Sequence, residues 1–315
     1  MKIAIFNPKK DFTKRQQEKL EELGEVTYIG PPTEHPLEEL IKLANGSEIL
    51  AVDPDNFGGF EKAKERLKQL METLPNLKGL ALDTTSYGWV DLEYCKKRNI
   101  PVSNCPGWSR QSIAELALAL LLNLSKNIIK LDRKTQKGEY KLEKGVELKG
   151  KTLGIVGVGS IGSTLAQLAK GIGMKVIGYN HSPKKVEGVE MKQSFDDLLT
   201  EADAISIHIT HTDENRKIYG KEQVEKMKDG VIIVNVADRE CVDEEAMAEA
   251  IKSGKVFSYA YEGEDLESGP LANLENAIGL KGFGWYTKEA LANLFQIWVD
   301  NIIAIAENKP QNIVN

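Results

Sequence analysis

Three glycines in one short turn are the residues of this chain that most clearly suggest chemistry. Gly157, Gly159 and Gly162 form a G-x-G-x-x-G pattern. An apolar run at 152–156 precedes the pattern, and apolar residues recur at helical spacing over 163–173. In such a strand–turn–helix unit the glycines allow a tight turn, close approach to a pyrophosphate and close helix packing. The residues predicted to contact the pyrophosphate of a dinucleotide are Gly157, Gly159, Ser160, Ile161 and Gly162.

The residues after the next strand bear on which dinucleotide fits. The strand predicted at 175–180 ends in Asn180, where an acidic residue would hydrogen-bond the ribose hydroxyls of NAD. Asn180 does not repel a 2′-phosphate, and Lys184 and Lys185 follow it closely. The sequence therefore favours NADP over NAD, although both lysines can also be solvated loop charges. The residues predicted at the adenosine ribose are Asn180, His181, Ser182 and Lys184.

Composition excludes several classes of function. The 315 residues carry a net charge of −6, so no basic surplus suggests a nucleic-acid partner. No apolar run reaches transmembrane length, and the N-terminus reads as a strand rather than a signal peptide. The three cysteines lie far apart, without metal-ligand or disulfide spacing. We therefore expect a reduced cytoplasmic protein that acts on a small molecule, without a metal, a nucleic acid or a membrane partner.

Strands and helices are predicted to alternate in two stretches, which is typical of α/β proteins with parallel sheets. The strands expected in the first stretch span residues 2–6, 26–28, 49–52, 79–82 and 101–103. Those expected in the second stretch span 152–156, 175–180, 204–207, 231–234 and 257–259. A long helix is predicted at 110–129 and a last helix at 288–306. The sequence thus predicts two doubly wound parallel-sheet domains.

Several motifs, read in order, resemble the D-isomer-specific 2-hydroxyacid dehydrogenases nearly end to end. The segments that carry the resemblance are 90–102, 105–108, 112–118, 148–157, 227–230, 234–237, 242–246, 274–277 and 285–287. The resemblance implies a flavodoxin-like substrate domain, residues 1–103 completed by 288–315, and a Rossmann cofactor domain at 104–287. It also implies an active site in the cleft between the domains and a homodimer held through the cofactor domains.

The resemblance assigns the chemistry to an arginine that holds the substrate, a histidine that moves a proton, and a glutamate that orients the histidine. The arginine position is Asp238 in this chain, with Arg239 one residue later. The histidine position is Gly282, and the last histidine of the chain is His211. The glutamate position is Glu267. An unpaired carboxylate at Asp238 would repel a substrate carboxylate, so we expect the ordinary mechanism of the family not to operate.

Three hypotheses follow. In the first, the protein is an NAD(P)-dependent oxidoreductase with an altered site that moves hydride to or from a small oxo or hydroxy compound. An acidic pocket of Asp238, Glu267 and Glu262 would then suit an amine-bearing substrate, with Tyr286 or Lys281 as proton donor. In the second hypothesis Arg239 turns into the pocket and binds a carboxylate. In the third, the chain is a non-catalytic NAD(P)-binding sensor or partner module.

The resemblance also suggests contacts beyond these positions. The first-domain loop that would hold the substrate carboxylate through its backbone amides contains Thr85, Ser86 and Tyr87, with Ser86 at a family glycine position. The same loop can equally be a structural turn. Further cofactor contacts are expected at Thr210, Val236, Ala237 and Glu262.

Overall fold

The computed structural model describes residues 1–210 and 212–315. The chain divides into two compact units, Met1–Trp108 with Lys288–Asn315, and Ser109–Thr287. The sequence placed the first boundary after residue 103, and the structure places it five residues later. The difference has a packing cause, because Cys105 and Trp108 pack into the hydrophobic core of the first unit.

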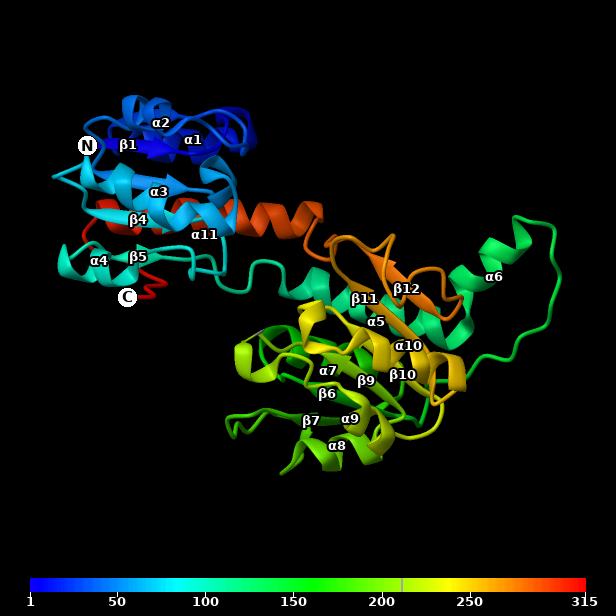
Figure 1. The fold of residues 1–315 in the computed structure, drawn as a ribbon. Helices are drawn as coiled ribbons and strands as arrows, with labels where there is room; N and C mark the ends of the chain where they lie inside the picture. The colour runs from blue at the N-terminus through cyan, green and yellow to red at the C-terminus, as the bar shows by residue number, and fades with distance from the viewer. Residues whose placement is uncertain (211) are drawn as a thin grey trace. The chain divides into compact units, whose positions relative to one another are not determined.

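The first unit is built on a parallel sheet of five strands (Figure 1). Its strand order is β2-β1-β3-β4-β5, which is the flavodoxin-like order with its switch point between β1 and β3. The predicted flavodoxin-like fold is therefore confirmed. The strands are β1 (Lys2–Ile5), β2 (Glu25–Tyr28), β3 (Ile49–Val52), β4 (Gly79–Leu82) and β5 (Val102–Ser103).

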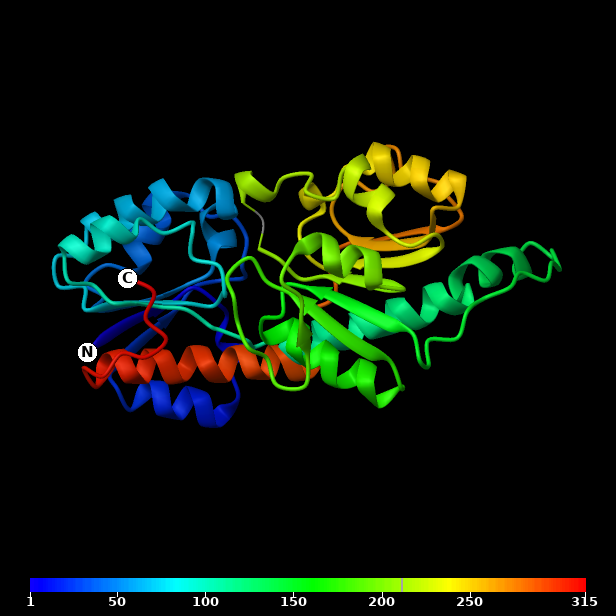
Figure 2. The ribbon, with the colours of Figure 1, turned by 90° about the horizontal axis from the view of Figure 1, so that it is seen from below.

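Helices cover both faces of this sheet (Figure 2). One face packs against α2 (Leu37–Leu43), α3 (Phe60–Glu72) and α4 (Leu92–Lys97). The other face packs against α1 (Lys14–Glu21) and the C-terminal helix α11 (Lys288–Ala306). Trp298 of α11 is fully buried, and its indole N–H donates to the carbonyl of Ala81 at 3.0 Å. The end of the chain thus completes the core of the unit in which the chain begins.

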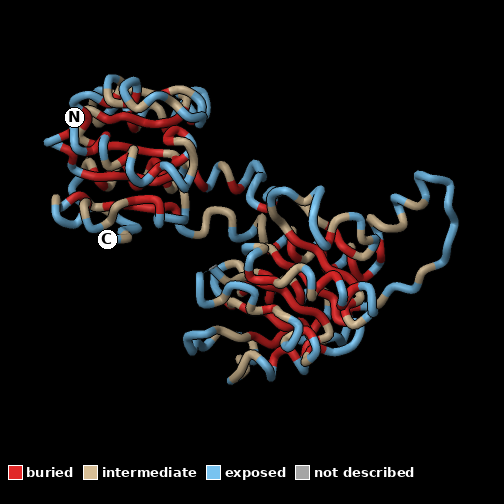
Figure 3. Tube along the Cα trace, in the orientation of Figure 1, coloured by how far each residue is buried: buried red, intermediate tan, exposed pale blue. Residues whose placement is uncertain are grey.

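The second unit contains a parallel sheet of seven strands in the order β12-β11-β10-β9-β6-β7-β8. The order reverses between β6 and β9, and in open α/β sheets ligands bind at the carboxyl ends of strands beside such a point. Buried residues follow the strands through the centre of the sheet (Figure 3). The strands are β6 (Thr152–Val156), β7 (Lys175–Tyr179), β8 (Glu190–Met191), β9 (Ala204–Ile207), β10 (Val231–Asn235), β11 (Val256–Glu262) and β12 (Ala277–Leu280).

The helices of the second unit also form two layers. The core of one face includes α5 (Arg110–Lys126) and α7 (Ser160–Gly171), and the core of the other includes α8 (Phe195–Glu201), α9 (Lys221–Lys226) and α10 (Glu244–Ser253). The single helix expected at 110–129 is broken at Asn127, whose φ of 55° is left-handed, and α6 (Ile128–Thr135) follows.

Among the described residues, no single helix is long and apolar enough to cross a membrane. Helices α5 and α6 reach the required length and composition only when taken together, and that pair is bent.

Candidate cofactor and substrate site

The three glycines of the turn after β6 differ in what surrounds them. Gly157 has a φ of +92°, and a Cβ there would lie 2.5 Å from the carbonyl oxygen of His208. A Cβ on Gly162 would lie 2.5 Å from the carbonyl oxygen of Gly157. A Cβ on Gly159 would meet no atom of the described residues within 4 Å. Two glycines are therefore required by the fold, whereas Gly159 borders open space.

Helix α7 begins at Ser160, three residues earlier than the sequence indicated, with the exposed Gly159 as its N-cap. The N–H groups of the first turn, including those of Ser160 and Ile161, have no partner within the helix. They lie beside the open space at Gly159 and at the positive end of the helix dipole. This arrangement fits the pyrophosphate of a dinucleotide.

The loop after β7 carries the residues expected at the ribose. Asn180 turns its carboxamide oxygen back to the glycine turn, where it accepts a hydrogen bond from the N–H of Val158 at 2.6 Å. The side chain therefore fixes the turn as well as bordering the ribose position. His181, Ser182 and Lys184 are exposed. They leave a polar and cationic surface without a carboxylate directly after the strand.

His208 follows β9 and lies against the glycine turn. Its Nε2 is 2.8 Å from the hydroxyl oxygen of Ser206, and its Nδ1 is buried without a hydrogen-bond partner among the described residues. Burial lowers the pKa of His208 to about 4, so the ring is neutral at pH 7. Thr210, two residues on, is exposed, and its carbonyl accepts from the Asn215 amide at 2.8 Å. His211 lies outside the described residues.

An open hollow of about 770 Å³ lies in the second unit, beside the carboxyl ends of β10 and β11. Seven carboxylates and three cations line it. The lining residues are Arg216, Lys217, Ala237, Asp238, Arg239, Glu240, Val242, Asp243, Glu244, Glu245, Glu262, Gly263, Glu264, Pro270 and Gly282. The excess of acidic side chains is the main chemical property of this hollow.

Each cation of the hollow is paired with one of its carboxylates. Arg239 lies 2.7 Å from Glu244. Arg216 pairs with Glu240 at 3.1 Å, and Lys217 pairs with Asp243 at 3.4 Å. The remaining carboxylates include Asp238 and Glu262. The lining is therefore net negative after its internal ion pairs are formed.

Arg239 is held in place rather than free to bind a substrate. Its Nε and Nη2 donate to the two carboxylate oxygens of Glu244 at 2.8 and 2.9 Å. Its Nη1 donates to the carbonyl of Glu264, and its guanidinium lies 5.9 Å from the centre of the Tyr261 ring. This geometry does not support the hypothesis that Arg239 turns inward to bind a carboxylate, because its planar fork is already occupied.

Asp238 differs from the unpaired carboxylate in a partly dry site that the sequence suggested. It is exposed, and its carboxylate accepts a hydrogen bond from the N–H of Glu240 at 2.9 Å. It is the N-cap of a short 3-10 helix, Arg239–Cys241. A cap of this kind stabilises the turn, so Asp238 has a structural partner.

Glu262, the last residue of β11, is half-buried and lines the same hollow as Gly282. Its Oε1 accepts from the N–H of Gly284 at 2.8 Å, which fixes the carboxyl group. Burial raises the pKa of Glu262, against the opposing effect of the backbone amides of 283 and 284. A Cβ on Gly282 would meet nothing within 4 Å in the part of the chain that the structure describes. A held carboxyl group thus lines the hollow together with an open position where the resemblance places a histidine.

The loop after β10 contributes the other expected cofactor residues of this region. Val236 and Ala237 are half-buried, and Ala237 lines the hollow. The N–H of Ala237 donates to the side-chain oxygen of Asn235 at 3.0 Å. That bond fixes the path of the chain from β10 into the Asp238 turn.

Two of the expected catalytic residues do not reach the hollow. Glu267 is exposed in the segment after β11 and is absent from the described lining residues. Tyr286 is 65% exposed and also absent from the lining, and its ring packs edge-on against Trp285. Within this unit the structure brings together Asp238, Glu262 and Gly282, without Glu267 or Tyr286.

In the first unit, the loop after β4 is held by several hydrogen bonds. Thr85 donates its hydroxyl to the carbonyl of Cys105 at 2.8 Å, and the amide of Asn104 donates to the Thr85 carbonyl at 2.7 Å. The indole of Trp89 donates to the carbonyl of Ser86 at 2.9 Å. Thr85, Ser86 and Tyr87 are all exposed, so a fixed loop presents their backbone.

Two carboxyl groups that the sequence analysis did not single out lie next to this loop. Asp53 directly follows β3 and Asp83 directly follows β4, and the two side chains are close enough to affect each other's ionisation. The sequence does contain a signal for them, because an acidic residue directly follows each of two consecutive buried strands. Neighbouring parallel strands end at the same edge of a sheet, so two such residues lie close together. Glu244 was also missed, because nothing in its spacing indicates a partner for Arg239.

Sequence comparison places the chain among known dehydrogenases and reductases. The NAD-binding domain of the D-isomer specific 2-hydroxyacid dehydrogenases matches residues 118–280, just over half of the chain. A glyoxylate reductase of Thermococcus litoralis is 35% identical over 264 residues, covering 79% of this chain and 80% of that protein. A D-3-phosphoglycerate dehydrogenase of Methanocaldococcus jannaschii is 34% identical over 306 residues, covering 94% of this chain. The chain spans only 56% of that dehydrogenase and 49% of a second one, from Archaeoglobus fulgidus.

Solved structures give the same result for the whole chain. An acyclic imino acid reductase, Bsp5, in complex with NADPH and D-Arg, superposes with a TM-score of 0.81 and 27% identity over the full length of both chains. The TT0316 protein of Thermus thermophilus superposes with a TM-score of 0.82 and 28% identity, also over both full lengths. The two parallel sheets, the glycine turn and these similarities agree, and the chain belongs to the D-isomer-specific 2-hydroxyacid dehydrogenase family.

Proposed function

We propose that this protein is an NAD(P)H-dependent reductase of a small, positively charged substrate, with hydride delivered to a C=N or C=O carbon. The observation that carries the proposal is the acidic hollow at the ends of β10 and β11, whose three cations are already paired. A site with this charge attracts an amine-bearing compound and disfavours a simple carboxylate.

The chemistry of a protonated imine suits the residues that line the hollow. Reduction of a ketone needs a proton for the oxygen as hydride arrives, which a general acid supplies. An iminium ion carries its proton already, so a reductase of imines does not need a histidine at position 282. A carboxylate such as that of Glu262 or Asp238 stabilises the cation electrostatically, whereas an arginine at 238 would repel it. The bound cofactor supplies the hydride, and the chain orients the acceptor carbon.

Similarity to an imino acid reductase supports the same proposal. The solved structure of Bsp5 was determined with NADPH and D-Arg, an amino acid with a cationic side chain, and it matches this chain over its full length. An identity of 27% does not transfer a substrate, so the support lies in the agreement between that ligand and the charge of the hollow.

We also propose that the cofactor is NADP in preference to NAD. Open space at Gly159 and the free amides at the start of α7 would hold the pyrophosphate. The loop after β7 offers exposed His181, Ser182 and Lys184, and a neutral Asn180 where an acid would repel a 2′-phosphate. Calorimetric titration with NADPH and NADH compares the two directly. Tighter binding of NADH would contradict the preference.

A substrate screen tests the proposed function. Oxidation of NADPH and NADH would be followed with 2-oxo acids alone, with 2-oxo acids in the presence of ammonium or a primary amine, and with oxo compounds that carry a cationic group. We expect turnover to require a cationic or imine-forming substrate and to fall about tenfold in Asp238→Asn. Silence across the screen with intact cofactor binding would instead support a non-catalytic NAD(P)-binding module.

We infer that the protein forms a homodimer through the region after α6. Residues 136–147 lie outside the helices and strands, and within them Tyr140 is 90% exposed and Leu142 is 85% exposed. Large apolar side chains on an exposed segment are typical of an interaction surface. A second copy of this chain is the proposed partner, as the family resemblance implies.

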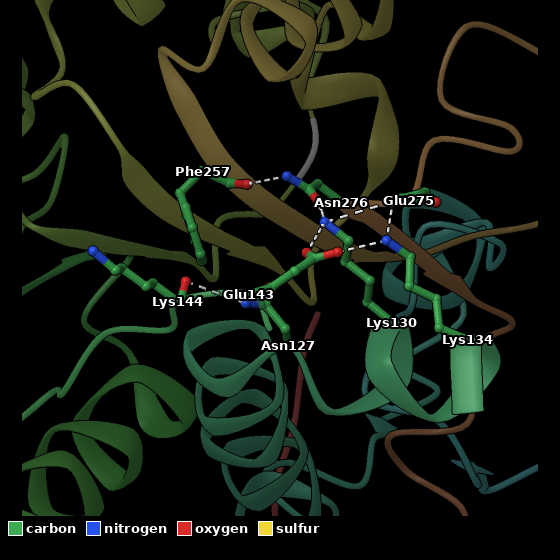
Figure 4. Close-up of polar contacts among 8 residues, drawn as sticks. All are labelled: Asn127, Lys130, Lys134, Glu143, Lys144, Phe257, Glu275 and Asn276. Carbon is green, nitrogen blue, oxygen red and sulfur yellow. Dashed lines mark hydrogen bonds and ion pairs between the residues drawn. The ribbon is translucent and has the colours of Figure 1, made fainter. Parts of the chain in front are cut away.

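Ion pairs fix the root of this segment to the body of the unit (Figure 4). Glu143 pairs with Lys130 and, at 2.5 Å, with Lys134, both from α6. Lys134 also pairs with Glu275 at 3.0 Å, and Lys130 donates to the side-chain oxygen of Asn276 at 2.8 Å. The two lysines hold the pKa of Glu143 down at about 2. The segment is therefore anchored while its apolar tip stays exposed.

Light scattering after gel filtration tests the dimer. We expect twice the chain mass for the unaltered protein and a shift toward the single chain mass in a Tyr140→Ser, Leu142→Ser double variant. Matched changes at Lys137 and Lys141, exposed residues of the same stretch, to serine serve as the control. A single-chain mass for the unaltered protein would contradict the inference.

A further inference from the structure

Three polar residues stand in one row across the sheet of the first unit. Ile5 pairs with Ala51, and Ala51 pairs with Ala81, in the registers of β1, β3 and β4. Two residues further along each strand are Asn7, Asp53 and Asp83. Because side chains two residues apart share a face of a strand, the three lie together on one face at the carboxyl edge of the sheet.

Backbone hydrogen bonds continue the ladder up to this row. The N–H of Phe6 donates to the carbonyl of Ala51 at 2.8 Å, and the N–H of Asp83 donates to the carbonyl of Val52 at 3.2 Å. The parallel register therefore extends past the ends of the strands. We name Asn7, Asp53 and Asp83 the carboxyl-edge row.

The two acids of the row act on each other's ionisation. Burial and the mutual repulsion of the two acids raise the pKa of Asp83 well above its usual range, and burial raises the pKa of Asp53. The pair therefore gives up its protons less readily than two isolated aspartates would, and it titrates as a unit.

The row has more hydrogen-bond acceptors than donors. Asn7 is 6% exposed and Asp83 is 7% exposed, and the Oδ1 of each is buried without a hydrogen-bond partner among the described residues. Buried oxygens in native proteins are nearly always hydrogen-bonded, because leaving one unsatisfied is costly. Asp53, which is only half-buried, accepts one bond from the N–H of Asp55 at 2.8 Å and has further acceptor capacity.

We propose that the carboxyl-edge row binds a primary ammonium group. An ammonium brings three N–H donors and a positive charge. The oxygens of Asn7, Asp53 and Asp83 supply acceptors for these donors, and the two acids supply a matching negative charge when they ionise. The ammonium site does not depend on the function proposed above.

Ammonium binding favours the ionised form of the pair. A cation next to two acids whose pKa values are raised lowers those pKa values, so we expect the complex to form with release of protons to the buffer. The other titratable groups that act on Asp83 are Asp55, after β3, and Cys105, after β5. Asp55 raises the pKa of Asp83 further, and burial keeps the Cys105 thiol protonated because it raises the pKa of that group.

Calorimetric titration of the full chain with 1,4-diaminobutane, in two buffers of different ionisation enthalpy, tests the proposal. We expect saturable binding with proton release at pH 7. Asp53→Asn keeps the side-chain shape and the bond to the N–H of Asp55 but removes the charge, so it should weaken binding tenfold or more. Asp55→Asn is the matched control, an exposed neighbour outside the row, and should change the affinity less than threefold.

Tetramethylammonium, a cation without N–H donors, provides a test that needs no variant. It should neither bind with proton release nor compete with the diamine. Equal binding of tetramethylammonium, competition by potassium ions, or unchanged diamine affinity in Asp53→Asn would each overturn the proposal. If Asp53→Asn fails to fold, proton release and the selectivity between the two cations in the unaltered protein decide alone.

The outcomes separate this site from the proposed function. Diamine binding with proton release but no turnover in the substrate screen would support the ammonium site and contradict the reductase of cationic substrates. Turnover of a cationic substrate with diamine affinity unaffected by Asp53→Asn would support the reductase and contradict the site.

Discussion

Arg239 and Glu244 form a two-point ion pair, with both carboxylate oxygens of Glu244 within 2.9 Å of guanidinium nitrogens. Glu244 lies in the first turn of α10, where the helix dipole also favours its negative charge. The pair ties the turn after β10 to that helix. Arg239 stands one residue after the position where the resemblance places an arginine, and it has a structural role.

Replacing Arg239 should lower stability without removing a substrate contact. Arg239→Gln leaves Glu244 partly buried without its partner, and we expect the free energy of unfolding to fall by about 1–3 kcal/mol. Arg216→Gln, which breaks the more exposed pair with Glu240, should cost about 0.5 kcal/mol or less. Urea unfolding measures both. A selective rise in KM for carboxylate substrates in Arg239→Gln, with unchanged stability, would restore the hypothesis of an inward-turned arginine.

Gly159→Asp should abolish dinucleotide binding while leaving the fold intact. The Cβ has room, since none of the described residues lies within 4 Å of it, but the carboxylate would stand where the pyrophosphate is expected. Gly162→Ala should instead destabilise the fold and lower the melting temperature, because its Cβ would lie 2.5 Å from a backbone oxygen. Calorimetry with NADPH and thermal unfolding separate the two effects. Full NADPH affinity in Gly159→Asp would contradict the cofactor site.

Pyruvate, glyoxylate and hydroxypyruvate should be poor substrates. General acid–base catalysis contributes about 10²–10⁴-fold, and the position that resembles the family histidine is Gly282. Steady-state oxidation of NADPH and NADH with each oxo acid measures this. Rapid turnover of any of the three would reveal a proton donor that the structure does not identify.

An Asp238→Arg, Gly282→His double variant should gain some 2-oxo acid reductase activity where each single variant gains none. The space at Gly282 accepts a larger side chain. Glu267 is exposed and outside the lining of the hollow, so Glu262 is the acid better placed to orient a new histidine. The same oxidation assay measures the gain. Equal activity in either single variant would contradict the need for both groups.

Stability should decline as the pH falls from about 6.5 to 4, in part because of His208. Its folded-state pKa of about 4 lies below the unfolded value of 6.5, so the unfolded chain binds a proton more readily in this window. The stabilising contribution of the neutral ring is complete above pH 6.5 and disappears toward pH 4. At about 1.4 kcal/mol per pKa unit, the difference between the two pKa values corresponds to roughly 3 kcal/mol in the free energy of unfolding. His208→Gln should flatten the profile of unfolding free energy against pH, whereas His181→Gln, an exposed control, should not. Parallel profiles for both variants would contradict the assignment.

The sequence predicted the fold well where one pattern determined one element. The branched apolar run at 152–156 and the glycines that follow it predicted β6, the turn and α7, because strand, turn and helix are each determined locally. The break at Asn127 was not predicted, since a left-handed residue inside an apolar helical pattern leaves no periodic signal. Strand β8 was not predicted, because its two residues are too few to show a recognisable strand pattern.

The sequence indicated which kinds of residues form the site, but not which of those residues contact each other. Asp238 and Glu262 were recognised as acidic residues near the expected chemistry. That Arg239 pairs with Glu244 and that Asp53 lies beside Asp83 depends on contacts between separate elements. Sequence spacing carries no direct information about such contacts.

The most direct test of the account compares two substrates that differ only in charge. One is a 2-oxo acid with a terminal guanidino group, and the other is its neutral analogue of the same length, each assayed with NADPH and ammonium. We predict that kcat/KM for the cationic compound exceeds that for the neutral one by tenfold or more. We also predict that Glu262→Gln removes most of this preference by lowering kcat/KM for the charged compound only. Equal or reversed preference in the unaltered protein would contradict the claim that the acidic hollow selects a cationic substrate.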